Sequence, residues 1–180
     1  MNDIDIRLIR IGFSGIKELQ ALSKQTFFEA FAWGNIQENI QHYMDAAFSY
    51  EKLAAEIGNA NSEFYFATTI NKVIGYMKVN SGNAQTEFQH SKGLEIERIY
   101  VLQDFQSKKV GQTLLEKAIE IANVNHLSYI WLGVWEKNPR AIKFYQKNGF
   151  VQFDQHFFKV GDDEQTDILM KLALKKEVRI

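Results

Sequence analysis

The chain has 180 residues, of which 46 % are apolar and 24 % charged, and its formal net charge is −1. These values are typical of one folded domain with a full-sized core, and the charge argues against a broad nucleic-acid or anionic-membrane surface. The absence of cysteine excludes a disulfide framework, a thiol nucleophile and a cysteine metal site.

The first strand is predicted where Ile4, Ile6 and Leu8 alternate with charged residues. Three helices follow, predicted from apolar residues at helical spacing; they cover 16–27, 36–47 and a short segment that Ser49 caps and Gly58 ends. A hairpin is then predicted from a strand at 64–70, a turn at 71–72 and a strand at 73–79. Residues 81–92 are mostly polar and are interpreted as a mobile connection.

The stretch 94–111 carries the most chemically suggestive pattern. It predicts a strand at 94–101, a short connection, and a helix that begins near Gly111. Glu95 and Glu97 share one face of that strand. The mouth of a helix attracts anions because its first N–H groups have no partner, and Lys108 and Lys109 add positive charge there. A solvated lysine pair in a connector explains the same residues equally well.

The second half of the chain predicts a further strand, a helix and two closing strands. Residues 129–135 are apolar on both faces, as expected for a central strand parallel to the one at 94–101. Asn138 is predicted to cap the next helix, with Pro139 in its first position and Gly149 at its end. Strands at 150–160 and 166–174 follow, with GDDEQ as the turn between them. One α/β domain over residues 1–180 is therefore expected.

Two motifs in this second half are most informative when their order and separation along the chain are considered together. The first is Gln106-x-x-Lys109-x-Gly111, and the second consists of Asn138, Ala141, Phe144, Tyr145, Gly149 and Phe150. The chain here resembles the GCN5-related N-acetyltransferase (GNAT) family, whose acetyl-CoA loop reads Gln/Arg-x-x-Gly-x-Gly/Ala and whose later motif is matched in full. Within the family, the segments LEIERIYV, YIWLGVWEKN and GDDEQTDILMKLAL resemble PaiA-type polyamine acetyltransferases.

The resemblance implies a fold, a reaction and a set of partners. The fold is a mixed sheet of about seven strands with helices on both faces and a splay between the fourth and fifth strands, after Ile99. The reaction moves an acetyl group from acetyl-CoA to a primary amine of a small acceptor, here a polyamine, directly in a ternary complex. The resemblance implies no metal, nucleic acid or membrane partner, and it is compatible with a homodimer. Because the sequence shows no signal peptide and no apolar span, a cytoplasmic location is expected.

The resemblance also implies roles for individual residues. The pantetheine arm is expected along the strand and the pyrophosphate on the loop, with further contacts from the later helix; the cofactor-binding residues are Ile99, Tyr100, Val101, Gln106, Ser107, Lys108, Lys109, Val110, Gly111, Gln112, Asn138, Ala141 and Lys147. Lys109 departs from the family's glycine. It is expected to be tolerated with a negative φ and to fail if the position needs a positive one.

Tyr145 is expected to protonate the departing thiolate, since a phenol is neutral at pH 7 and donates one hydrogen bond. Glu95 or Glu97 is expected to accept the proton of the amine, directly or through water. The alternative, of equal weight, is that both glutamates pair with Arg98 or orient the substrate. His156 is interpreted as structural rather than as a proton relay. An acetyl-CoA-binding sensor with little turnover is the alternative function.

Overall fold

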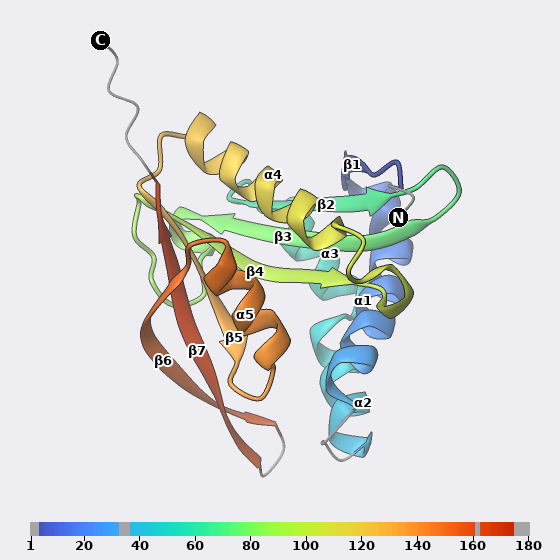
Figure 1. The fold of residues 1–180 in the computed structure, drawn as a ribbon. Coiled ribbons are helices and arrows are strands. Elements are labelled where there is room, and N and C mark those ends of the chain that lie inside the picture. Colours follow the sequence, from blue (N-terminus) through green and yellow to red (C-terminus); the bar gives the residue numbers. More distant parts are fainter. Residues whose placement is uncertain (1–3, 33–36, 161–162, 175–180) are drawn as a thin grey trace. The chain divides into compact units, whose positions relative to one another are not determined.

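The computed structural model describes residues 4–32, 37–160 and 163–174. The chain divides into two compact units: the first comprises residues 1–79 and 98–117, and the second comprises residues 80–97 and 118–180. The boundaries between the units fall inside β3, β4 and α4 (Figure 1). Each unit is described by itself below.

The strands form a seven-stranded sheet of order β1-β2-β3-β4-β5-β7-β6. The strands are β1 (Arg7–Arg10), β2 (Ser62–Thr68), β3 (Val73–Ser81), β4 (Gly93–Val101), β5 (Tyr129–Trp135), β6 (Val151–Val160) and β7 (Asp163–Ala173). The helices are α1 (Ile16–Phe31), α2 (Gln37–Ala47), α3 (Tyr50–Gly58), α4 (Val110–Val124) and α5 (Pro139–Lys147). β4 and β5 pair in parallel, whereas β7 is antiparallel to both β5 and β6. The predicted mixed α/β sheet is therefore confirmed.

The first unit has its core between its strands and α1–α3. The predicted apolar faces of α1 and α3 are buried there, together with Phe64 and Phe66 of β2. The Ser49 side chain accepts a hydrogen bond from the Lys52 N–H and caps α3 as predicted. The alternation predicts Ile70 on the buried face of β2, but it is 80 % exposed, because the strand ends at Thr68 and Ile70 lies in the turn. The part of the predicted second helix at Ile36 lies outside the described residues.

A buried ionic cluster, made of Glu56, Lys78 and Arg98, lies in the first unit. The Arg98 guanidinium donates to both carboxylate oxygens of Glu56, at 2.7 and 2.9 Å. The Lys78 ammonium lies 3.1 Å from Glu56 Oε1, with its side chain only 5 % exposed. One carboxylate from α3 thus holds two cations from β3 and β4.

The second unit is built on β5 and the long β6–β7 hairpin, the orange and red strands of Figure 1. Its α5 begins as predicted, since Asn138 Oδ1 accepts from the Ala141 N–H at 3.1 Å and Pro139 follows the cap. Gly149 ends the helix with a φ of +86°, a conformation that favours glycine. β7 begins at Asp163, earlier than the predicted Thr166, so the predicted turn is shorter; residues 161–162 lie outside the described ranges.

The parallel pairing of β4 with β5 covers only Gly93–Glu95 against Tyr129–Trp131. β5 continues to Trp135 in register with β7, while Ile96 and Glu97 have no counterpart on β5 in the described register. The predicted splay is therefore present, but it begins before Ile99. Within the described ranges, no helix combines the length and apolar composition that a bilayer crossing needs.

Candidate active site

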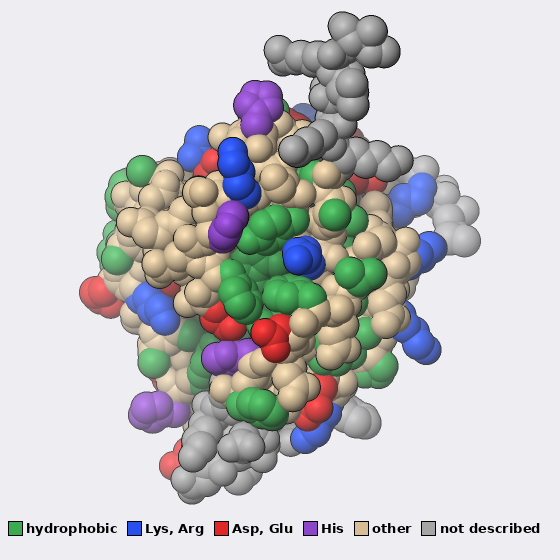
Figure 2. Space-filling model, turned by 90° about the vertical axis from the view of Figure 1, so that its left-hand side faces the viewer, with side chains coloured by type: hydrophobic (Ala, Val, Ile, Leu, Met, Phe, Trp, Pro, Cys, Tyr) green, Lys and Arg blue, Asp and Glu red, His purple; other side chains and the backbone are tan. Residues whose placement is uncertain are grey.

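A pocket of about 140 Å³ lies in the second unit, over β4, β5, β7 and the segment that joins β3 to β4. Its lining residues are Thr86, Glu87, Glu95, Ile96, Glu97, Trp131, Gly133, Asp167 and Leu169. Figure 2 faces the side of the molecule that carries β6 and β7, and shows acidic and histidine side chains beside an apolar patch. A pocket with this many carboxylates suits a cationic ligand.

Glu95 and Glu97 line this pocket together, as their spacing on one strand predicts. The Asn80 amide nitrogen donates to both carboxylates, at 3.0 Å for Glu95 and 2.6 Å for Glu97. Glu95 is 3 % exposed and also accepts from the Thr86 N–H and hydroxyl. Burial raises the pKa of Glu95, while its hydrogen bonds from Thr86 and Asn80 oppose the rise. No ion pair joins Glu95 to Arg98 among the described residues.

The segment from β3 to β4, interpreted from its polar composition as a mobile connection, forms part of the pocket wall and makes specific contacts there. Gln85 is 1 % exposed, and its amide donates to the carbonyls of Gly82 and His90. The Trp131 indole N–H donates to Gln85 Oε1 at 2.7 Å. The Phe88 ring also packs edge-on against Trp131, with centroids 5.2 Å apart. These contacts hold Thr86 and Glu87 at the pocket.

Two further acidic residues of the pocket were not predicted from the sequence. Asp167 lies on β7 directly opposite His156 of β6, and Glu87 Oε1 lies 3.2 Å from His156 Nδ1. Burial raises the pKa of Asp167 to about 6, with His156 lowering it and Glu87 raising it. Asp167 and Leu169 lie two residues apart on β7, so the alternation of side chains along a strand places both on one face of the sheet.

The loop before α4 lies in the first unit and contains the predicted anion site. Ser107 and Lys109 both have a left-handed backbone, with φ of +63° and +65°. Alternating conformations of this kind turn successive N–H groups toward one side and form a concave anion-binding nest. Lys109 therefore does not meet the expected condition of a negative φ, and its side chain makes this conformation unfavourable by roughly 1 kcal/mol.

The other loop and strand residues also belong to the first unit. Gln106 is half-buried, and its side-chain amide donates to the Val101 carbonyl at 3.2 Å. α4 begins at Val110, and the Lys109 carbonyl accepts from the Thr113 N–H at 2.9 Å. The remaining predicted cofactor residues of this unit, Ile99, Tyr100, Lys108, Gly111 and Gln112, are half-buried or exposed. The loop and the mouth of α4 can thus offer backbone donors to an anion.

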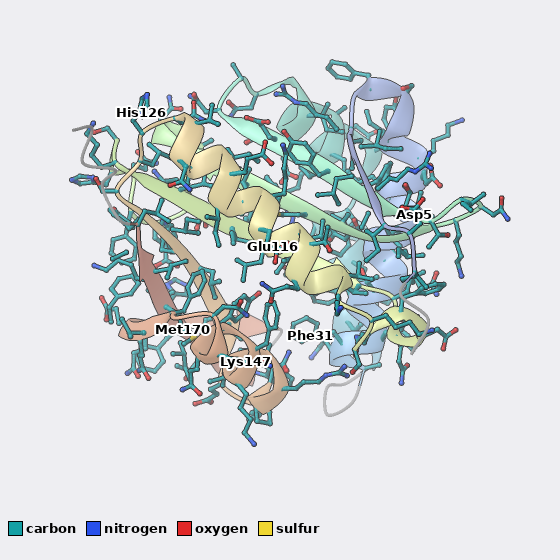
Figure 3. All side chains as sticks on the ribbon, turned by 45° about the horizontal axis from the view of Figure 1, so that its top comes forward. Asp5, Phe31, Glu116, His126, Lys147 and Met170 are labelled. Atoms are coloured by element: carbon teal, nitrogen blue, oxygen red, sulfur yellow. The ribbon has the colours of Figure 1, made fainter. Side chains whose placement is uncertain are left out.

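Tyr145 lies on α5 in the second unit and is 6 % exposed. It packs edge-on against Phe144 and Phe150, with ring centroids 5.2 and 5.5 Å away. Burial raises the pKa of Tyr145, so its phenol stays protonated at neutral pH. Ala141, one turn earlier, is half-buried, and Lys147, near the end of α5 (Figure 3), is exposed.

A model of the acetyltransferase (GNAT) family matches residues 20–150. The chain belongs to this family. An uncharacterized N-acetyltransferase of Lactobacillus delbrueckii subsp. lactis is 37 % identical to it over 94 % of this chain and 98 % of the relative. The spermidine N(1)-acetyltransferase of Thermoplasma acidophilum is 25 % identical over 93 % of this chain and 97 % of that enzyme.

Solved structures show the same GNAT fold. The PaiA N-acetyltransferase of Thermoplasma acidophilum, crystallised with coenzyme A, has a TM-score of 0.79 at 23 % identity and covers 95 % of this chain and 100 % of its own. The described residues of this GNAT acetyltransferase contain no group of three or more His, Cys, Asp or Glu side chains that could hold a metal ion.

Proposed function

We propose that this acetyltransferase moves an acetyl group from acetyl-CoA to a primary amine of a small polycationic acceptor, in particular a polyamine. The observation that carries the proposal is the pocket lined by Glu87, Glu95, Glu97 and Asp167. Several carboxylates around one small pocket attract several positive charges, and a polyamine presents ammonium groups at short, regular intervals. The similarity to a spermidine N(1)-acetyltransferase supports the same acceptor class.

For cofactor binding, we propose that the loop 106–112 holds the pyrophosphate through its backbone. The left-handed Ser107 and Lys109 and the mouth of α4 supply N–H donors there. The backbone of 99–101 is proposed to bind the pantetheine amides. Asn138, Ala141 and Lys147 of the second unit are proposed as further cofactor contacts.

Acetyl-CoA supplies an activated acetyl group as its thioester. The acceptor nitrogen must first give up a proton; it then bonds to the acetyl carbon while the carbon–sulfur bond breaks. Because Glu95 is 3 % exposed and accepts three hydrogen bonds from Asn80 and Thr86, we propose that it positions the pocket wall. We propose that Glu97, which also accepts from Asn80 but is more exposed, takes the proton, directly or through water. Tyr145, which burial keeps protonated, is proposed to donate to the thiolate.

A steady-state assay of CoA release across an amine panel tests this function. Spermidine, spermine and diamines should be the best acceptors, with monoamines, peptide N-termini and aminoglycosides much poorer. Efficient turnover of peptides or aminoglycosides with inert polyamines would contradict the acceptor class. Tight binding of acetyl-CoA without CoA release for any amine would favour the sensor instead.

The Tyr145→Phe variant tests the proposed acid. The variant keeps the ring packing and removes only the hydroxyl, so kcat should fall about 10²–10⁴-fold with little change in stability or acetyl-CoA affinity. Tyr50→Phe makes the same chemical change at an exposed position and serves as the control. Full kcat in Tyr145→Phe, under conditions where chemistry limits the rate, would remove Tyr145 from the mechanism.

A further inference from the structure

The four acidic side chains of the pocket differ in what they contact. Glu95 accepts from Asn80 and Thr86, Glu97 accepts from Asn80, and Glu87 is paired with His156. Asp167 has no hydrogen-bond or ion-pair partner for its carboxylate within the described part of the chain. It is also the member of the set that comes from β7, so it approaches the pocket from a different strand than Glu95 and Glu97.

The neighbours of Asp167 leave its carboxylate open to the pocket. Gly133 of β5 lies beside it, and a Cβ atom built on Gly133 would come within 3.2 Å of Asp167 Oδ2. The absence of a side chain at Gly133 therefore leaves space next to this oxygen. The charged groups around it are His156 from β6, Glu87 from the β3–β4 segment, and Glu95 and Glu97 from β4; the pocket residues of β5 carry no charge.

We infer that Asp167 is a specificity-determining residue that binds a second ammonium group of the acceptor, the one that is not acetylated. A partly buried carboxylate without a partner is unfavourable, and a cationic ligand removes that cost by supplying hydrogen bonds and opposite charge. The acetylated nitrogen leaves as a neutral amide, which no longer offers a carboxylate a positive charge. A second ammonium stays charged throughout the reaction. This inference rests on the proposed function, since it assumes an amine acceptor.

The pH dependence of the acceptor KM follows from the same arrangement. The pKa of Asp167, raised to about 6 by burial, leaves the carboxylate charged at pH 7.5 and protonated in more acidic solution. Below pH about 6, KM for a diamine should rise in the wild type, while the uncharged amide of the Asp167→Asn variant should remove this rise. Measuring KM and kcat separately assigns the effect to acceptor binding.

The decisive experiment compares Asp167→Asn with wild type on amines of similar length that carry one or two ammonium groups. For diamines and spermidine, KM should rise about 10- to 100-fold with kcat nearly unchanged, because one charge-assisted contact is lost. For monoamines, which have no second ammonium group, kcat/KM should change much less. Asp154→Asn serves as the matched control, since Asp154 is an exposed residue of β6 in the same unit and does not line the pocket.

An equal loss for monoamines and diamines would overturn the inference, because Asp167 would then act on the reacting nitrogen or on the fold. Unchanged KM values for all amines would overturn it as well, while leaving the proposed function intact. A second measurement does not depend on turnover: spermidine should raise the melting temperature of the wild type and of Asp154→Asn, but raise that of Asp167→Asn much less. If wild type acetylates no amine, the proposed function fails, and this shift still tests cation binding by Asp167.

Discussion

Each unit contains a charged cluster, and the two clusters differ in their ratio of cations to carboxylates. In the first unit, the carboxylate of Glu56 serves both Arg98 and Lys78, so the anion is held by cations on two sides. In the second unit, four carboxylates line one pocket; Asn80 donates to Glu95 and Glu97, and the His156 imidazole lies 3.2 Å from Glu87 and opposite Asp167 on the neighbouring strand.

This difference indicates that the Glu56 cluster stabilises the fold, whereas the pocket carboxylates are suited to bind a cationic ligand. A buried pair that loses one member leaves an uncompensated charge, so the cluster around Glu56 contributes to stability only as a complete set. A partly buried carboxylate without a hydrogen bond or ion pair among the described residues, such as that of Asp167, lowers the stability of the free protein, and a cationic acceptor would reverse that cost. Four substitutions test this comparison, from the largest expected effect to the smallest.

Glu56→Gln should give the largest loss of stability, because it leaves Lys78 and Arg98 buried without their carboxylate. The free energy of unfolding should fall by about 3–5 kcal/mol, measured by urea denaturation followed by circular dichroism. Glu116→Gln, on the exposed side of α4 (Figure 3), removes the same charge and should change it little. Equal small effects of both changes would show that the paired cluster does not stabilise the first unit.

Asp167→Asn should have the opposite sign and increase stability. Folding raises the pKa of this carboxyl from 3.8 to about 6, so ionisation disfavours the native state. The wild type therefore loses stability as pH rises from about 4 to about 6, and the variant should be about 1–3 kcal/mol more stable above pH 6, with no gain below pH 4. Urea unfolding at pH 3.5 and pH 8 measures this. A variant less stable at pH 8 would mean that Asp167 is paired in the free protein.

Lys109→Gly tests whether an unfavourable backbone conformation occurs at the proposed pyrophosphate-binding loop of the first unit, as an unfavourable carboxylate does in the pocket of the second. Glycine adopts a φ of +65° without steric cost, so the variant should gain about 0.5–1 kcal/mol, after its larger unfolded-state entropy is counted. Acetyl-CoA affinity and activity should change modestly. Lys108→Gly is the control, because Lys108 is not among the residues with positive φ and should lose stability. Collapse of cofactor binding in Lys109→Gly alone would identify its ammonium as a principal ligand.

Gly133→Ala should have the smallest effect and should act on the pocket rather than on the fold. Its Cβ would lie 3.2 Å from Asp167 Oδ2, a contact that the carboxylate can relieve by moving slightly. We expect KM for spermidine to rise about threefold, equivalent to about 0.7 kcal/mol, with a nearly unchanged melting temperature. Gly12→Ala, where an added Cβ meets no atom within 4 Å, is the control. An unchanged KM would show that the space beside Asp167 is not used.

Features that depend on neighbouring residues in the chain could be predicted from the sequence. The Asn138 cap, the Ser49 cap and the shared face of Glu95 and Glu97 each follow from local spacing, and the structure confirms them. The parallel β4–β5 pair was also predictable, because a helix separates two apolar strands. The catalytic and cofactor-binding roles of the candidate residues stay predictions.

Features that depend on pairing between distant segments could not be predicted in this way. Asp167 reaches the pocket through the register of β7 with β5 and β6, and Glu87 through the hydrogen bonds of Gln85, neither of which leaves a periodic pattern. The positive φ of Lys109 was similarly hidden, since lysine rarely adopts it. The departure of Lys109 from the family's glycine was nevertheless the available signal, because glycine is the residue that such a backbone favours.

The hydrogen bond from Trp131 to Gln85 makes the intrinsic fluorescence of Trp131 a way to observe the pocket wall. Trp131 is one of three tryptophans in the sequence, and it is buried in the pocket wall with its indole N–H directed at the segment that carries Thr86 and Glu87. Indole fluorescence responds to nearby charge and to the loss of an N–H hydrogen bond. We expect acceptor binding to change this emission, which can be measured without a label and before any chemical step. Trp131→Phe is the reference, since it keeps only the emission of the other two tryptophans.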